Sequence, residues 1–400
     1  MAIACPDCAT LQTIPPLPPW SVARCRVCGL ALERTAGRTI DGALAFALSA
    51  LLLLVPANWL PLMTVSFAGA ARQSVLGSGV WVLWQQGWPL LSIQIAFLVL
   101  ILPFVQFGLL TGVLLALRLG YRPGWLGRAF RWATKLAPWA MPDVFLLGCV
   151  VGYSRVVAML PARVGPGGWC LAGAALFSLV TEATLDPRRV WRMIAPEHAV
   201  PAGPVLSCRS CDMVLPMERE DRPCPRCDAR LRAREPDSLT RTMALVAAGF
   251  LLYGPANLYP MTNTFTFEGT VHHTIYSGIE QLVQARLWPL AVLIFCTSIA
   301  IPFLKLAGLT WLILSVRRAS RAALLARTRL HRFIEKIGRW SNIDVFTIAV
   351  FAPLIQFGDL ASSQAGQGAN AFLLVVMLTM LASITFDPRL MWDLAGRRNG

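Results

Sequence analysis

Eight of the eleven cysteines fall into four Cys-x-x-Cys pairs, a spacing that is typical of metal sites. The pairs form two quartets, which are Cys5, Cys8, Cys25 and Cys28 near the start of the chain and Cys208, Cys211, Cys224 and Cys227 near its middle. Two such pairs supply four thiolates for a tetrahedral Zn²⁺ ion, as in a zinc ribbon. We therefore predict one zinc ribbon at residues 1–38 and a second at residues 200–236.

Both zinc ions are predicted to be structural, because four cysteine ligands leave no coordination position for a substrate. Two alternatives use the same cysteines: a rubredoxin-like iron centre that transfers electrons, and a thioredoxin-type dithiol. A dithiol needs only one Cys-x-x-Cys, so the paired arrangement disfavours it. A ribbon of about 35 residues has a small core, so each ribbon is expected to be disordered without its metal.

The composition predicts that these ribbons are attached to a membrane protein. Hydrophobic residues make up 56% of the 400 residues and charged residues only 14%, against about 25% in a typical soluble domain. This excludes a disordered chain and disfavours a soluble enzyme or a nucleic-acid binder. Residues 73–117 contain 45 consecutive positions without a charge, whereas one membrane span needs about 20 apolar residues.

Eight spans are predicted, and all should be helices because a backbone in lipid must satisfy its own hydrogen bonds. They are residues 42–63, 88–117, 139–160, 168–185, 242–261, 288–316, 343–360 and 369–386. Alternation along the segment at 262–287 predicts a short strand at 264–267 and a helical stretch at 277–284. Pro103 and Pro302 are expected to kink the second and sixth spans.

The distribution of positive charge predicts the orientation of the protein. With the N-terminus inside, 31 of the 36 Lys and Arg residues fall on one side, which the positive-inside rule assigns to the cytoplasm. Both termini and both ribbons are therefore expected to be cytoplasmic. The first residues have no basic segment followed by an apolar core, so no signal peptide is predicted. The net charge of +15 also suits anionic lipid headgroups on that side.

The chain contains an internal repeat. Three of its seven motif pairs are Pro-Ala-Asn at 56–58 and 255–257, Trp-x-x-x-Asp-Val-Phe at 139–145 and 340–346, and Asp-Pro-Arg at 186–188 and 387–389. The offset between partners stays between 199 and 201 residues. Each repeat has an even number of spans, so both enter from the same side and are parallel. We predict four-helix modules at 39–195 and 237–400, related by a pseudo-two-fold axis along the membrane normal.

Polar residues inside the predicted spans form a second candidate site, because such residues are costly in lipid and usually functional. We predict a cluster of Lys305, Asp344 and Thr385, with Asp143 and Thr184 as its counterpart in the first repeat. The cluster would bind a lipid headgroup, couple protons or pin the helices together. The alternatives are local: the aspartates cap helices, Lys305 snorkels to the headgroups, and the threonines pack between helices.

Two further motifs lie at predicted helix ends. Asn58 and Asn257 are bracketed by prolines, which free backbone carbonyls that an amide can satisfy. They are interpreted as shaped helix ends, with a lipid gate as the alternative. The Asp186-Pro187 pair predicts a helix that has Asp186 as its N-cap and begins at Pro187. Trp191 and the arginines around it then suit an amphipathic helix on the membrane surface.

Tandem modules of a cysteine ribbon followed by four spans resemble the paraquat-inducible protein A family. The resemblance covers essentially the whole chain and rests on the two quartets and on the paired Pro-Ala-Asn, Trp-x-x-x-Asp-Val-Phe and Asp-Pro-Arg motifs. It implies a role in lipid traffic at a bacterial inner membrane. It also implies that phospholipid passes to or from a periplasmic tunnel protein of the MCE family.

The sequence predicts no enzyme. It has no phosphate-binding Gly-x-x-x-x-Gly-Lys-Ser/Thr motif, so it should not hydrolyse ATP itself, and no set of nucleophile and base stands out. No nucleic-acid partner is predicted. Two alternatives to lipid transport stay open: a membrane-bound metal or redox sensor that acts through its ribbons, and a passive scaffold for another complex.

Overall fold

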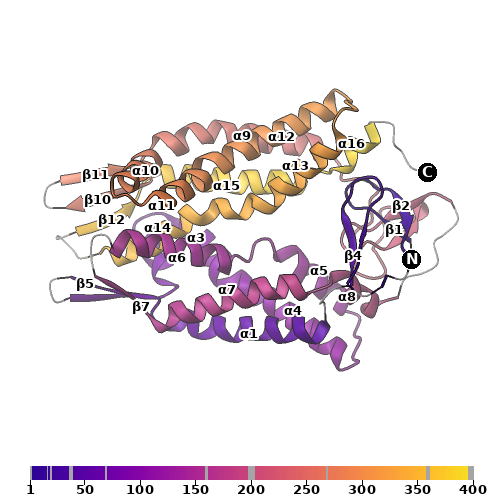
Figure 1. Cartoon of the computed structure of the whole chain (residues 1–400), viewed down its shortest axis with the longest axis horizontal. Helices are drawn as coiled ribbons and strands as arrows, with labels where there is room; N and C mark the ends of the chain where they lie inside the picture. Colours follow the sequence, from indigo (N-terminus) through magenta and orange to yellow (C-terminus); the bar gives the residue numbers. More distant parts are fainter. Residues whose placement is uncertain are drawn as a thin grey trace.

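The computed structural model describes residues 2–15, 17–18, 20–35, 39–67, 70–157, 161–196, 203–266, 269–356 and 361–394. The described chain is mostly helical and forms an elongated body (Figure 1). The two cysteine ribbons lie at one end of this body, and two three-stranded sheets lie at the other. The long helices run between these ends and separate the cysteines from the sheets.

The same series of elements occurs twice, as the repeated motifs predict. Module 1 contains α1 (Ile40–Trp59), β5 (Met63–Phe67), β6 (Ala70–Ser74), α2 (Ser78–Gln85), α3 (Pro89–Ile95), α4 (Leu102–Arg118), α5 (Leu126–Leu136), α6 (Pro142–Val157), β7 (Ala162–Val164), α7 (Pro166–Thr184) and α8 (Pro187–Ile194). Module 2 contains α9 (Ser238–Leu258), β10 (Thr262–Thr266), β11 (Gly269–His273), α10 (Ile275–Gln284), α11 (Trp288–Ile294), α12 (Ile301–Arg317), α13 (Leu324–Ile337), α14 (Ile343–Leu354), β12 (Ala361–Ala365), α15 (Gln367–Thr385) and α16 (Arg389–Leu394). Their sheets lie at the same end of the molecule, so the modules run in parallel.

Five helical stretches in the described chain are long and apolar enough to cross a membrane. They are α1, Pro89–Arg118, α9, Trp288–Arg317 and α15, with 20, 30, 21, 30 and 19 residues. α7 makes a sixth together with α8, from which it is bent by 67°. These helices identify a multi-pass membrane protein, as the composition predicts.

The helix in the predicted span 343–360 is shorter in the structure than in the prediction. α14 has 12 residues and ends at Leu354, whereas crossing a bilayer takes about 20. In the predicted span 139–160, α6 covers 16 residues up to Val157, where the described residues stop. Most of α14 is buried in protein, and it packs against α6 and α2 of module 1. A helix that its neighbours cover does not need a full-length apolar surface. Residues 158–160 and 357–360 lie outside the described residues, so the eight-span topology stays a prediction.

The two modules meet at close backbone approaches around α14. A Cβ added at Gly79 of α2 would lie only 2.1 Å from the carbonyl oxygen of Ala349. A Cβ added at Gly148 of α6 would lie 2.8 Å from the Cβ of Phe346. The ring of Phe346 also meets that of Phe145 edge-on, with 5.5 Å between centroids. Small residues therefore let α14 sit directly against module 1.

Both long spans contain a π-helical turn, at Ala96–Ile101 and at Phe295–Ala300. Pro103 and Pro302 follow directly, in the first turn of α4 and α12. Proline has no N–H to donate to the helix, so the regular hydrogen-bond ladder cannot pass through it. The disturbance predicted at these prolines thus takes the form of a widened turn within a continuous span.

Each module carries an antiparallel sheet at the end opposite the ribbons. The strand orders are β6-β5-β7 in module 1 and β11-β10-β12 in module 2. In module 2, Thr264 of the central strand pairs with Val271 on one side and Ser363 on the other. The strand and helix predicted within 262–287 are confirmed as β10 and α10.

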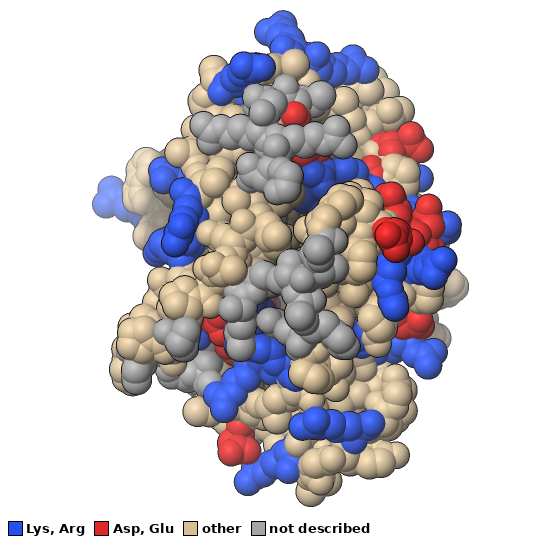
Figure 2. Space-filling view, turned by 90° about the vertical axis from the view of Figure 1, so that its right-hand side faces the viewer, with Lys and Arg blue, Asp and Glu red and all other residues tan. Residues whose placement is uncertain are grey.

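The ribbons consist of short hairpins. Ribbon 1 pairs β1 (Ala2–Ala4) with β2 (Leu11–Thr13) and β3 (Val22–Arg24) with β4 (Ala31–Arg34). Ribbon 2 pairs β8 (Val205–Ser207) with β9 (Val214–Pro216), and its second hairpin has a single bridge between Pro223 and Arg230. Seen end-on, the face that bears the ribbons carries Lys and Arg side chains over most of its width (Figure 2). This is the side that the charge distribution assigns to the cytoplasm.

Candidate functional site

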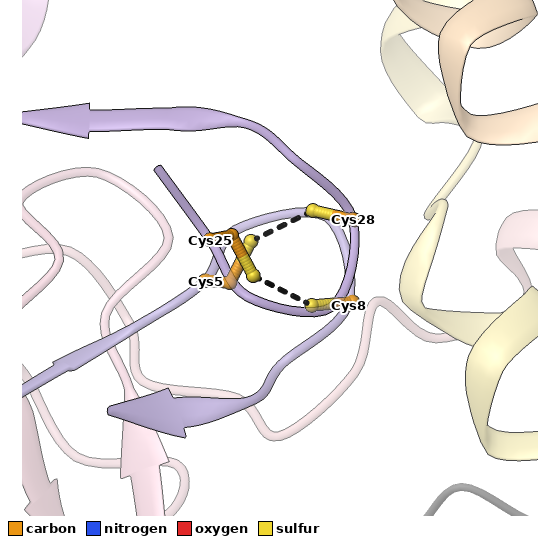
Figure 3. A group of neighbouring side chains, drawn as sticks. All are labelled: Cys5, Cys8, Cys25 and Cys28. Carbon is orange, nitrogen blue, oxygen red and sulfur yellow. Dashed lines mark hydrogen bonds between the residues drawn. The ribbon is translucent and has the colours of Figure 1, made fainter. Parts of the chain in front are cut away.

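The four sulfurs of each cysteine quartet point toward a common centre, as Figure 3 shows for Cys5, Cys8, Cys25 and Cys28. In both quartets all Sγ atoms lie within 4.8 Å of one another, and all eight residues are buried. The closest Sγ–Sγ distances are 3.4 and 3.6 Å in ribbon 1, and 3.5 and 3.6 Å in ribbon 2. Tetrahedral zinc, with Zn–S bonds of about 2.3 Å, separates its sulfurs by about 3.8 Å. Each quartet can therefore hold a metal ion.

All four Cys-x-x-Cys pairs use the same turn. The residue after the second cysteine has a positive φ, namely 57° at Ala9, 70° at Gly29, 56° at Asp212 and 59° at Asp228. Its N–H donates to the carbonyl of the first cysteine over 2.8–2.9 Å in every case. The left-handed residue folds the chain back, which turns both sulfurs of a pair inward. Gly29 is the only glycine of the four, so the sequence showed this requirement at one knuckle alone.

Hydrogen bonds among the sulfurs shift their pKa values in opposite directions. Hydrogen bonding to Cys28 lowers the pKa of Cys8 to about 4, whereas hydrogen bonding to Cys28 raises the pKa of Cys5. The lowered pKa of Cys8 favours its thiolate, which is the form that ligates a metal.

The ribbons cross over, so that each packs against the module of the other repeat. Ribbon 1 shares a hydrophobic core with α12, α13 and α16 of module 2, including Leu309 and Trp392. Arg332 of α13 donates from Nη2 to Cys28 Sγ over 3.1 Å and forms an ion pair with Asp7. Module 2 thereby places a positive charge beside the sulfurs of ribbon 1.

Ribbon 2 packs in the same crossed manner on α4 and α5 of module 1. A Cβ added at Gly127 of α5 would lie 1.9 Å from the carbonyl oxygen of Arg226, which stands between Pro225 and Cys227. The chain of ribbon 2 therefore rests directly on the backbone of α5. Position in the sequence did not indicate this exchange of partners.

α8 joins the two ribbons. Its arginine Arg188 donates to the carbonyl of Leu32 in ribbon 1 and forms an ion pair of 3.1 Å with Asp212 in ribbon 2. Asp186 caps the helix through the N–H of Arg188, as predicted. The prediction of a membrane-surface helix is wrong for Trp191, which is 3% exposed and packs edge-on against Phe130.

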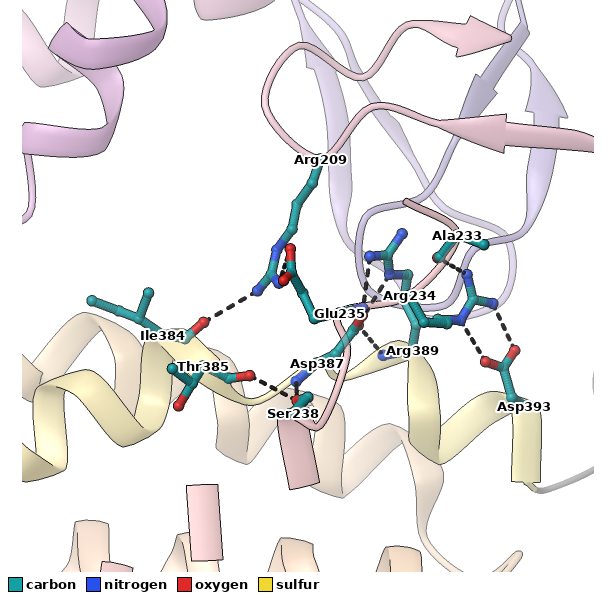
Figure 4. Close-up of polar contacts among 10 residues, drawn as sticks. All are labelled: Arg209, Ala233, Arg234, Glu235, Ser238, Ile384, Thr385, Asp387, Arg389 and Asp393. Atoms are coloured by element: carbon teal, nitrogen blue, oxygen red, sulfur yellow. Dashed lines mark hydrogen bonds and ion pairs between the residues drawn. The ribbon is translucent and has the colours of Figure 1, made fainter. Parts of the chain in front are cut away.

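Polar contacts fix ribbon 2, including its last residues, against the end of module 2 (Figure 4). Arg234 holds Asp393 of α16 in a two-pronged ion pair. Arg209 donates to the carbonyl of Ile384 over 3.2 Å, at the end of α15. Burial acts to raise the pKa of Asp387, but hydrogen bonds from Arg389 outweigh it, so the pKa lies below its usual value. These contacts join ribbon 2 to α15 and α16 of module 2.

Lys305 of α12 is buried, with 1% of its surface exposed. Its Nζ makes no hydrogen bond to any residue that the structure describes, and it lies 3.7 Å from the position of a Cβ at Gly338. Asp344, another residue of the predicted cluster, accepts a hydrogen bond from Ser298 of the π-helical turn. Its position at the start of a helix also fits the alternative of a charge in the first turn.

The two threonines of the predicted cluster bond within their own helices. Thr184 donates to the carbonyl of Val180, and Thr385 donates to that of Leu381, both over 2.8 Å. Thr385 Oγ1 also lies 3.4 Å from Thr242 Oγ1 of α9. These contacts match the helix-packing alternative.

Asp143 pairs across the boundary between the modules. Its Oδ2 lies 3.7 Å from Nη2 of Arg339, which also holds Glu182 over 3.1 and 3.3 Å. Sequence reasoning missed Arg339, Glu182 and Ser298. Glu182 was visible as a charge inside the predicted span 168–185, whereas Arg339 lies just outside any span.

The proline-bracketed asparagines occupy matching places in the two modules. Asn58 donates from Nδ2 to the carbonyl of Leu54 over 2.7 Å, and Asn257 donates to that of Tyr253 over 2.8 Å. Each bond lies within the last turn of its helix, next to the proline. The arrangement matches the interpretation as a shaped helix end.

Comparison with known proteins identifies relatives over the whole length of the chain. The profile of the family described as paraquat-inducible protein A matches residues 40–195 and 239–395. The intermembrane transport protein PqiA of Escherichia coli K12 is 32% identical over 403 residues, covering 98% of this chain and 95% of the relative. No solved structure gives a significant match.

Two further relatives carry transport names. The lipophilic envelope-spanning tunnel protein A of Escherichia coli K12 is 28% identical over 97% of this chain and 90% of its own length. A probable intermembrane transport protein of Haemophilus influenzae Rd is 24% identical over 99% and 96%. All three relatives are named as transport or tunnel proteins, and none is named as an enzyme.

Proposed function

The chain belongs to the paraquat-inducible protein A family, and we propose that it is the inner-membrane component of a system that moves phospholipid across a bacterial envelope. The observation that carries the proposal is the match along nearly the whole chain to proteins named for intermembrane transport. In this proposal the protein passes lipid to or from a periplasmic tunnel protein of the MCE family. The chain does not act as an enzyme.

The proposed topology has eight spans with both termini and both ribbons in the cytoplasm. It is supported by the excess of Lys and Arg on the ribbon side, and by the basic surface at that end (Figure 2). The two three-stranded sheets are then periplasmic. They form the surface on which a periplasmic tunnel protein would dock. The domain units are the ribbons at 1–38 and 200–236 and the modules at 39–195 and 237–400.

Each ribbon is proposed to hold one structural Zn²⁺ ion. The support is the four-sulfur geometry, with buried ligands on identical turns. Bound zinc joins hairpins that have little core of their own. Metal analysis of the purified protein should find about two zinc ions per chain. Iron, or much less zinc, would contradict the assignment.

The polar groups of the spans are proposed to serve transport. Lys305 offers a buried positive charge without a hydrogen-bond partner in the described chain, which suits the phosphate of a headgroup. Asp344 and Thr385 would complete its surroundings, with Asp143 and Thr184 as the counterpart in module 1. Since the chain has no ATP-binding motif, the driving force comes from an ion gradient, a partner or mass action.

Mass spectrometry of the protein purified gently from native membranes tests this function. We expect phospholipid and an MCE-family protein to be recovered together with the chain. Recovery of phospholipid also separates transport from a passive scaffold. If neither lipid nor such a partner is recovered, the proposed function is wrong.

A further inference from the structure

Module 1 contains a small pocket between α4, α5 and α7. Its volume is about 60 Å³, which is several times the room that one water molecule needs. Apolar side chains form part of the wall, including Phe107, Leu110 and Ala133. The polar part of the wall includes Gln106, Thr134, Thr181 and Glu182. The pocket lies at the last turns of α5 and α7, whereas the first turn of α5 contacts ribbon 2.

The repeat shows what fills the matching place in module 2. Gln106 of α4 corresponds to Lys305 of α12, because both follow a matching Pro-Phe pair at an offset of 199 residues. Ala137, which lines the pocket, corresponds to Gly338 at an offset of 201 residues. In module 2 the ammonium group of Lys305 reaches to within 3.7 Å of a Cβ position at Gly338. Module 1 has a shorter, neutral side chain there, and space remains.

The polar groups around this space offer oxygen lone pairs. Gln106 is 7% exposed, and its Oε1 accepts no hydrogen bond from any described residue. The hydroxyl protons of Thr134 and Thr181 are donated to the carbonyls of Phe130 and Phe177, over 3.1 and 2.7 Å. Both hydroxyl oxygens therefore remain as acceptors. A ligand with several N–H donors would match this set.

The charges around the pocket leave room for one more positive group. The carboxylates of Glu182 and Asp143 share the single guanidinium of Arg339, at 3.1 and 3.7 Å. When both carboxyl groups are ionised, the guanidinium of Arg339 compensates only one of the two negative charges, and Glu182, whose side chain is 46% exposed, stays accessible to a cation. Glu182 itself lines the pocket. In a membrane region, such a charge favours a cationic partner.

We propose that this pocket binds a primary ammonium group, in the place that Lys305 takes in module 2. An ammonium has three N–H donors for the acceptors of the pocket and the charge that the carboxylates lack. Two sources share this chemistry: the ethanolamine headgroup of a phospholipid, and a free primary amine. The first source deepens the proposed function and rests on it, since it names the headgroup that module 1 selects.

Titration of the purified full-length protein tests the pocket. The probes are short-chain phosphatidylethanolamine, short-chain phosphatidylcholine and free ethanolamine. Their binding is measured by calorimetry and by native mass spectrometry. Phosphatidylcholine is the decisive comparison, because its nitrogen is charged but has no N–H to donate. We expect phosphatidylethanolamine to bind about tenfold or more tightly than phosphatidylcholine, since the difference is charge-assisted hydrogen bonds. Free ethanolamine that binds as well as the lipid would identify the free amine as the ligand.

Three variants locate the binding. Gln106→Lys places an ammonium group in the pocket and should reduce the preference for ethanolamine about tenfold or more. Gln106→Met keeps the size of the side chain but removes the Oε1 acceptor, and it should also reduce the preference for ethanolamine. Thr111→Val is the control, because Thr111 is a buried polar residue of the same helix that does not line the pocket.

Equal binding of the two lipids would overturn the proposal that this pocket binds an ammonium group. A preference for phosphatidylethanolamine that is retained in both Gln106→Lys and Gln106→Met would overturn it as well. Failure of the pocket is distinguishable from failure of the proposed function. The total phospholipid recovered per protein from native membranes reports on transport. The headgroup preference and its dependence on Gln106 report on the pocket alone.

Discussion

Lys305 is unusual among the buried side chains because its charge has no hydrogen-bond partner in the described chain. Burying an unpaired ammonium group is unfavourable, so a residue kept only for stability would be expected to be apolar. The aliphatic part of the side chain could be supplied equally well by methionine. Substitutions of Lys305 can therefore distinguish a functional role of its charge from a structural role of its side chain.

Replacing Lys305 should abolish function while the protein stays folded in the membrane. Lys305→Ala removes the charge, and Lys305→Met does so without leaving a cavity. For Lys305→Met we expect a Tm equal to or above that of the wild type, because an unpaired buried charge is lost. Lipid transport in cells and the amount of protein in the membrane are the measurements. Leu304→Ala, a change at the exposed neighbouring residue, is the control and should behave like the wild type.

If Lys305→Ala or Lys305→Met keeps wild-type transport, Lys305 has no central role. A loss of protein from the membrane together with a loss of transport would instead indicate a structural role for the residue.

At the residue scale, the sequence predicts what depends on short spacing. The eight cysteines were identified as metal ligands because the two ligands of each pair are separated by only two residues. This pattern can be recognised without knowing which distant residues come into contact. The contact of Arg332 with Cys28 joins residues 304 positions apart. The ion pair of Arg339 with Asp143 also crosses from one module to the other. Such contacts depend on how the helices pack against one another, and short motifs in a single sequence do not show this packing.

At the scale of elements, the lengths of the long spans were predicted well, whereas the length of the helix buried between the modules was predicted poorly. The span predicted at 42–63 is found as α1, whose outer face is open, because a helix in lipid must be apolar along its whole length. α14 is apolar for a different reason, since it is buried between the modules. Hydropathy does not distinguish these two surroundings, so a 12-residue buried helix resembles a span.

The contact between ribbon 2 and α5 gives a prediction about a single element. Gly127→Ala adds a Cβ only 1.9 Å from the carbonyl oxygen of Arg226, so the ribbon must move away from the helix. The expected cost is roughly 1–3 kcal/mol, the range for overpacking a tight contact. Hydrogen exchange should become faster in the hairpins of ribbon 2. Gly124→Ala is the matched control, because a Cβ there would meet nothing within 4 Å.

Unchanged exchange in the Gly127→Ala protein would show that ribbon 2 does not rest on α5. A change confined to ribbon 1 would contradict the crossed arrangement.

At the scale of the whole molecule, the crossed ribbons make the two repeats dependent on each other. Ribbon 1 is followed in sequence by module 1 but packs on module 2, and ribbon 2 precedes module 2 but packs on module 1. α8 then contacts both ribbons through Arg188. Each module is therefore covered at its ribbon end by a domain that belongs to the other repeat. The repeated sequence indicated two similar units, but it contained nothing that distinguishes crossed from uncrossed packing.

Loss of the metal from one ribbon should therefore change hydrogen exchange in the module on which that ribbon packs. A ribbon without its metal is expected to lose its fold and leave the helices on which it packs. Cys8→Ser should therefore deprotect α13 of module 2, and Cys224→Ser should deprotect α5 of module 1, in each case by about tenfold or more in hydrogen exchange. Removal of both metals with a chelator should deprotect both helices. Cys149→Ser, a buried cysteine outside the quartets, is the control and should leave both helices protected. If Cys8→Ser instead deprotects α5 and leaves α13 unchanged, each ribbon serves its own module and the crossed arrangement is wrong.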